Sequence, residues 1–155
     1  MYARAKRAIG SGGANMASGG ITLGVGVFKL SLHRASASAA LAALSALETF
    51  ASVPGEVSAR GGYVAGGRNI APATGFWTAG ASAKQMKFSY TADGLVFTAS
   101  GSDLAGIKYA LIRTSSGAGA GKVLCYVTLT ATPITLASGN TFTVKPNTLG
   151  VFTLA

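Results

Sequence analysis

The stretch that most constrains this chain runs from Val53 to Gly67, with the sequence Val-Pro-Gly-Glu-Val-Ser-Ala-Arg-Gly-Gly-Tyr-Val-Ala-Gly-Gly. One large aromatic residue, Tyr63, stands between the glycine pairs Gly61-Gly62 and Gly66-Gly67. Glycine adopts positive φ values at low cost and allows close backbone approach, so the pattern predicts a sharp reversal that holds one ring in place. We therefore interpret Gly61, Gly62, Tyr63, Gly66 and Gly67 as a structural hinge. The ring either packs inside the domain or is displayed to a partner.

The chain after the hinge consists of short alternating segments separated by turn residues, which is typical of antiparallel β structure. An earlier segment, Ile21–His33, also alternates, and a change of phase near Val27-Phe28 predicts a β-bulge. Asp93-Gly94 predicts a β-hairpin between its two flanking strands. The later strands are expected at Arg68–Thr74, Lys84–Thr91, Leu95–Ser100, Ile107–Thr114, Lys122–Thr130, Asn140–Lys145 and Gly150–Leu154. Together they predict a mainly all-β fold, an antiparallel β-sandwich or jelly roll.

One helix and one arm accompany these strands. Ala35–Phe50 is alanine-rich, with Leu41, Leu44 and Leu47 at a spacing of three, and this predicts a short helix of two to four turns beside the sheet. Residues 1–20 are basic and glycine-rich, with too few large apolar side chains to fold alone. We expect them to form an extended N-terminal arm that is disordered or lies on a neighbour, and residues 21–155 to form the β-sandwich domain.

Composition points towards a protein partner. Charged residues make up 11% of the 155-residue chain, against roughly 25% in ordinary soluble domains. A surface so poor in charge indicates burial against another protein, although abundant glycine and alanine also lower the fraction. The net charge is +9, and Arg4, Lys6 and Arg7 cluster in the arm while the other basic residues are scattered. Nucleic-acid binding is therefore expected from the arm at most, since no aromatic residues alternate with the basic ones.

Residues for catalysis are scarce. His33 is the only histidine, has no acidic neighbour in sequence, and is interpreted as a surface residue at a strand end, on the polar face that also carries Lys29 and Ser31. There are 4 acidic residues in the chain, too few for most hydrolytic or hard-metal sites. Asp93 and Asp103 are expected to cap backbone N–H groups in turns, and Glu56 to pair with Arg60. We predict no catalytic residue, cofactor or metal, and no enzymatic activity.

Three further segments complete the search for a site. Gly117–Lys122 has neither the spacing nor the Ser/Thr of a phosphate-binding loop. The single cysteine, Cys125, lies in an apolar strand and is predicted to be buried and inert. Phe76 and Trp77 form an aromatic pair in an expected loop, which either anchors a partner or plugs one end of the sandwich. The N-terminus lacks the apolar run of a signal peptide, and no run is long enough to cross a membrane.

The hinge and the segments around it resemble a known family. The order is a strand, a short helix, Val-Pro-Gly-Glu-Val at 53–57 and Gly-Gly-Tyr-x-x-Gly-Gly at 61–67. Ile-Lys-Tyr-Ala-Leu-Ile-Arg-Thr at 107–114, Lys-Val-Leu-Cys-Tyr-Val at 122–127 and Gly-Val-Phe-Thr-Leu at 150–154 follow. From residue 21 to residue 154 this resembles small β-sandwich virion structural proteins of tailed bacteriophages. The resemblance implies a β-sandwich fold and membership of a virion, in a protein made in the bacterial cytoplasm.

Two functions follow as expectations. The first is a capsid decoration or cement protein that binds the shell of the major capsid protein, forms a homo-oligomer in the particle, and uses its basic surface against an acidic capsid exterior. The alternative is a tail, fibre or head–tail junction component with a host-binding role. Copy number per virion distinguishes them, because decoration needs many copies and a tail or junction needs few.

Overall fold

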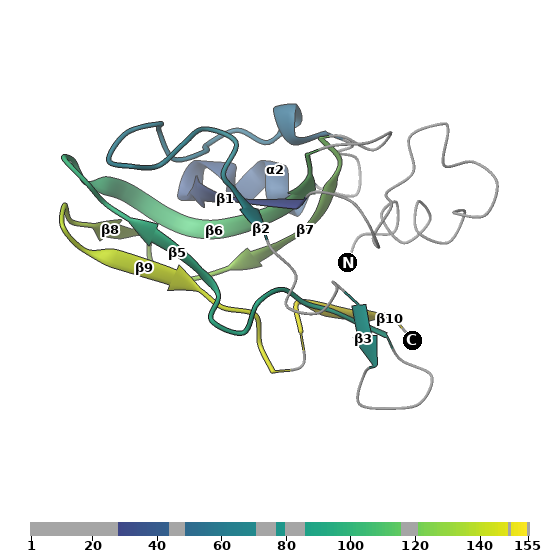
Figure 1. The fold of residues 1–155 in the computed structure, drawn as a ribbon. Helices are drawn as coiled ribbons and strands as arrows, with labels where there is room; N and C mark the ends of the chain where they lie inside the picture. The colour runs from purple at the N-terminus through teal and green to yellow at the C-terminus, as the bar shows by residue number, and fades with distance from the viewer. Residues whose placement is uncertain are drawn as a thin grey trace.

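The computed structural model describes residues 28–43, 49–70, 77–79, 86–115, 121–148 and 150–154. Its strands pair antiparallel throughout the described residues, and one short α-helix accompanies them (Figure 1). The prediction of a mainly antiparallel β fold with a single short helix is confirmed.

The largest sheet is built around β6 (Leu104–Thr114), which is paired along both of its edges. One edge pairs with β1 (Phe28–Arg34), whose far side pairs with β2 (Arg68–Ile70). The other edge pairs with β7 (Val123–Thr128) along its C-terminal part and with β8 (Ile134–Leu136) along its N-terminal part. The pairing of β1 with β6 therefore forms the centre of the fold.

A second layer packs on one face of this sheet. It contains the three-stranded sheet β10-β4-β3 (Phe152–Leu154, Met86–Phe88 and Trp77–Ala79) and the pair β5–β9 (Leu95–Thr98 and Thr141–Val144). Figure 1 shows these strands below β6. The main hydrophobic core lies between the two layers, and its largest fully buried members are Phe28, Phe88, Leu30, Leu32, Leu104, Ile107 and Leu124.

A helical segment covers the other face of the large sheet. It comprises two 3₁₀ turns, Ala35–Ala37 and Phe50–Ser52, and the helix α2 (Ser38–Ala42), which lies above β6 in Figure 1. A smaller cluster of buried residues lies beneath it, namely Ala37, Leu41, Val53, Tyr109, Leu111 and Val123. Both faces of β1 are thus covered, which a single alternating strand pattern does not reveal.

The predicted helix over Ala35–Phe50 is wrong in its extent. The α-helix ends at Ala42, and Ala43 caps it with φ −89° and ψ 12°. Thr49 has extended backbone (φ −129°, ψ 150°) and forms a bridge with Lys122, so the helix cannot run through it. Leu41 is buried, whereas Leu44 and Leu47 lie outside the described residues.

The predicted hairpin at Asp93-Gly94 is also wrong. The turn exists, because the Gly94 N–H donates to the Thr91 carbonyl at 2.9 Å, but its flanking strands do not pair with each other. Phe88 of β4 already pairs with Trp77 on one side and with Phe152 on the other. Both edges of β4 are therefore occupied, and β5 pairs with β9 in a separate sheet.

Strand positions agree with the sequence in part. Ile21–Val27, the expected bulge at Val27 and the segment Ala71–Phe76 lie outside the described residues. Trp77 begins strand β3, although a loop was expected there. The three-residue strand β8 was not predicted, since it is very short and follows a proline.

Candidate functional site

A group of bonded polar side chains surrounds β1, and the hinge forms one half of this arrangement. The backbone of Glu56 forms an antiparallel β-bridge with His33, and the Val57 N–H donates to the Leu32 carbonyl at 2.9 Å. The chain then leaves β1 and returns to it at Arg68, which pairs with Leu30. Between these contacts the glycine pairs make the reversal. Their φ values are Gly61 57°, Gly62 78°, Gly66 84° and Gly67 79°.

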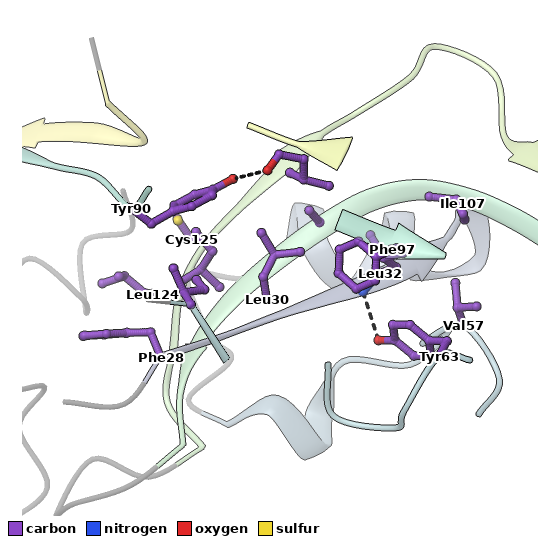
Figure 2. Packing of buried hydrophobic residues seen from close by; sticks show 14 of the residues in the cluster. Phe28, Leu30, Leu32, Val57, Tyr63, Tyr90, Phe97, Ile107, Leu124 and Cys125 are labelled. Carbon is purple, nitrogen blue, oxygen red and sulfur yellow. Dashed lines mark hydrogen bonds between the residues drawn. The ribbon is translucent and has the colours of Figure 1, made fainter. Parts of the chain in front are cut away.

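Tyr63 fills the gap that this loop leaves along the edge of β1. Its hydroxyl accepts a hydrogen bond from the Leu32 N–H at 3.0 Å and donates to Glu56 Oε1 at 2.7 Å (Figure 2 shows the first of these). The ring is 4% exposed and lies 6.0 Å from the Phe97 ring, between centroids. A side-chain oxygen thus takes the place of the backbone acceptor that a continuous strand would supply. Burial is the main cause that raises the pKa of the Tyr63 hydroxyl, with the Glu56 hydrogen bond second.

Glu56 joins the two ends of the loop. Its Oε1 also accepts from the Gly66 N–H at 2.6 Å. Within the described residues it is bonded to Tyr63 and Gly66 instead of Arg60, which is exposed, so the expected Glu56–Arg60 pair is wrong. The physical reason is geometric, because the hinge brings the Gly66 N–H and the Tyr63 hydroxyl to one carboxylate oxygen.

His33 forms the other half, on the opposite face of β1. The prediction of a surface histidine is wrong, since His33 and Ser31 are both 0% exposed. The Pro54 carbonyl, 3.3 Å from Nδ1, can only accept, so Nδ1 carries the proton. Nε2 then accepts from the Ser31 hydroxyl at 3.0 Å, and the Phe50 ring packs edge-on at 5.8 Å. The helical segment covers this face of β1 and buries His33 and Ser31, which the alternating sequence pattern predicts to be exposed to solvent.

This serine–histidine contact has the spacing of a nucleophile and its base, but its surroundings differ from those of a catalytic pair. Nδ1 faces a main-chain carbonyl in place of a carboxylate. Neither side chain reaches solvent, so a substrate carbonyl cannot approach Ser31 Oγ in this conformation. The contact instead pairs two polar groups that burial would otherwise leave unpaired.

Arg113 connects the two halves across the sheet. Its guanidinium lies 4.3 Å from the centre of the Phe50 ring and donates to the Gly66 carbonyl at 3.0 Å and to the Thr114 carbonyl at 3.3 Å. Its Nε is buried without a hydrogen-bond partner. These partners are two carbonyl oxygens and an aromatic ring. None of the three carries a negative charge that would neutralise the guanidinium. Nothing in the sequence marks Arg113 as a connecting residue beyond its position in a predicted strand.

The remaining candidates fall into place separately. Cys125 is buried, as predicted, and burial raises the pKa of its thiol to about 12, which keeps it protonated and unreactive. Asp103 accepts a backbone N–H as expected, but from a distant turn instead of its own, since Oδ1 accepts from the Ser138 N–H at 2.8 Å. Asp93 lies exposed in the turn before β5. No group of three or more His, Cys, Asp or Glu residues suited to a metal occurs in the described ranges.

Of the predicted partner-binding residues, the structure describes only the backbone of Trp77. Arg4, Lys6, Arg7 and Phe76 lie outside the described residues. Trp77 starts β3, with its backbone opposite Phe88 of β4. Among the helices that the structure describes, none is long and apolar enough to span a membrane.

Acid should weaken the packing of the helical segment on β1. Burial lowers the pKa of His33 below its ordinary value of 6.5, an effect only partly offset by the Pro54 hydrogen bond and the Glu56 charge. The unfolded chain therefore takes up a proton first, and the free energy of unfolding should fall as the pH drops below about 6.5. Urea unfolding measured from pH 7.5 to pH 5 tests this. A His33→Gln variant should lose less stability over that range, and parallel curves for the two proteins would contradict the prediction.

Comparison with known proteins gives no match to a protein-family model, a curated protein or a solved structure.

Proposed function

We propose that this chain is a structural protein of a tailed-bacteriophage virion, a capsid decoration protein that binds and stabilises the shell of the major capsid protein. One observation carries the proposal: the reactive polar groups His33, Ser31, Tyr63 and Glu56 are paired inside the described fold, while several basic side chains have neutral partners. His33, Ser31 and Tyr63 are buried, and Glu56 is bonded within the hinge. Such an arrangement suits a protein that binds through its surface.

The partners of the basic side chains support an acidic target. Arg34 donates to the Ser58 hydroxyl at 2.9 Å, Lys87 to the Thr148 carbonyl at 3.2 Å, and Arg68 to the Val96 carbonyl. These acceptors carry no formal charge, so they do not neutralise the three basic side chains. A net charge of +9 favours association with a negatively charged surface. The resemblance of the hinge motif to virion proteins of tailed bacteriophages supports a virion as the particle.

The binding test uses shells of the major capsid protein from the phage that encodes this chain. Purified protein should co-sediment with the shells and raise their melting temperature, because a ligand that binds only the assembled state stabilises it. A copy number close to that of the coat protein supports decoration. A few copies per virion would instead assign the chain to the tail or junction, and absence from the virion would overturn the proposal.

Binding should weaken as salt increases. Exposed charges are screened over about 8–10 Å near physiological ionic strength, so the apparent Kd should rise between low and moderate salt. Replacing Arg4, Lys6 and Arg7 together by alanine should reduce this salt dependence if the arm contributes to docking. Sedimentation at several salt concentrations measures both effects. Affinity that does not change with salt would show that charge is not what drives docking.

A further inference from the structure

The outer face of the β5–β9 pair is uncharged and exposed. Val96 lies opposite Thr143, and Thr98 lies opposite Thr141, and all four side chains are exposed. The alternate residues, Phe97 and Phe142, point to the main core. All four outer residues are β-branched, so their side chains are already restricted in χ1 and lose little freedom when a partner covers them.

The hinge loop borders this face and adds to it. The Gly61 carbonyl accepts from the Ser100 N–H at 3.0 Å, beyond one end of β5, and Arg68 donates to the Val96 carbonyl near the other end. Between these two contacts the loop carries Val64, which at 65% exposure is the most exposed large hydrophobic side chain described. The loop therefore occupies the free edge of β5 and presents an apolar residue from the same segment.

Positive charge predominates around the face. Arg60 and Arg68 of the hinge loop are exposed, and exposed Lys145 directly follows β9. Two acidic residues also lie near this border. Asp93 is in the turn at the Lys145 end, and exposed Asp103 lies beyond the other end, where its Oδ1 accepts from the Ser138 N–H. Glu56 is bonded inside the hinge. The face thus has an uncharged centre and a charged border in which Arg60, Arg68 and Lys145 outnumber Asp93 and Asp103, and an uncharged centre with a polar rim is the arrangement of a protein-binding surface.

We propose that this face, made of Val96, Thr98, Thr141 and Thr143 with Arg60 and Arg68 of the hinge loop at its border, docks against an acidic protein surface. The inference rests on the proposed function, in which that surface is the exterior of the capsid shell. A second copy of the chain is a poorer partner for the face. Two copies would bring the same arginines together, and like charges at an interface oppose association.

A matched pair of substitutions tests the surface. Val96→Glu places a carboxylate at the centre of the face, whereas Val127→Glu makes the same change on β7, in the large sheet, at similar exposure (41% and 47%). Val96→Glu should weaken binding to coat-protein shells by roughly tenfold or more, as expected at the centre of an interface. Val127→Glu should leave the affinity unchanged, and the thermal melting of both variants should match that of the wild type.

A second pair keeps the test decisive if Val96→Glu fails to fold. Thr143→Glu, on the facing strand, should reproduce the loss, and Thr128→Glu on β7 should not. If the wild type binds shells and all four variants bind equally, the docking face is wrong while the proposed function stands. If the wild type does not bind the shells of its own phage, the proposed function fails first, and the assignment of a shell as partner fails with it.

Discussion

Gly67→Ala should prevent the domain from folding stably. A Cβ added at Gly67 would lie 2.1 Å from the Leu30 carbonyl oxygen, 2.6 Å from the Leu30 carbonyl carbon and 2.7 Å from the Ser31 Cα, all backbone atoms of the central sheet. The φ of 79° adds the cost of left-handed backbone for an L-residue, about 1–2 kcal/mol. Together these effects should lower the free energy of unfolding by about 4 kcal/mol or more, at the upper end for single substitutions.

Gly101→Ala provides the control for this prediction. Gly101 has nearly the same φ, 76°, but a Cβ there would meet nothing within 4 Å. Its substitution should cost only the backbone strain. Urea unfolding followed by circular dichroism compares the two variants. Equal losses would show that the hinge moves away from β1 easily and that close approach is not what requires glycine at position 67.

Tyr63→Ala should destabilise the domain by about 3–5 kcal/mol, the range for removal of a buried aromatic side chain. The substitution removes both the packing against Phe97 and the acceptor for the Leu32 N–H. Tyr63→Phe retains the ring but leaves that N–H unpaired, and should cost about 1–3 kcal/mol. The burial of the ring favours the interpretation of Tyr63 as a core anchor over its display to a partner.

Glu56→Gln separates hydrogen bonding from charge at the same place. The amide oxygen of glutamine can still accept from Tyr63 and from the Gly66 N–H, so this variant should lose less stability than Tyr63→Phe. Denaturant unfolding measures all three variants. If the Tyr63→Ala protein melts like the wild type yet no longer binds shells, Tyr63 contributes to the binding interface and not to the stability of the core.

The hinge was readable from the sequence because its constraints are local. Paired glycines around one aromatic residue require positive φ and a covered ring, and both are present. The environment of His33 was not readable. Alternation along β1 separates its two faces, but it does not show that the Phe50–Pro54 segment, far along the chain, returns to bury the polar face.

The pairing errors have the same non-local origin. Asp93-Gly94 has the local chemistry of a hairpin, yet its first strand is enclosed by Trp77 and Phe152, which no short-range pattern connects. Likewise, Thr49 cannot be part of the helix, because its backbone is extended where it forms a β-bridge with Lys122. Local patterns indicate where strands and turns lie, whereas competition among distant partners decides which of them pair.

The central pairing of β1 with β6 has a consequence for how quickly the protein reaches its native state. Phe28 pairs with Thr114 and Arg34 with Ile107, so the main sheet cannot form before these distant segments meet. Proteins dominated by such contacts fold slowly, in milliseconds to seconds, since loop closure precedes any gain from pairing. During synthesis β1 leaves the ribosome long before β6 and stays unpaired with it until then. The apolar face of β1 is therefore available to chaperones, and to other nascent chains, until β6 has been made.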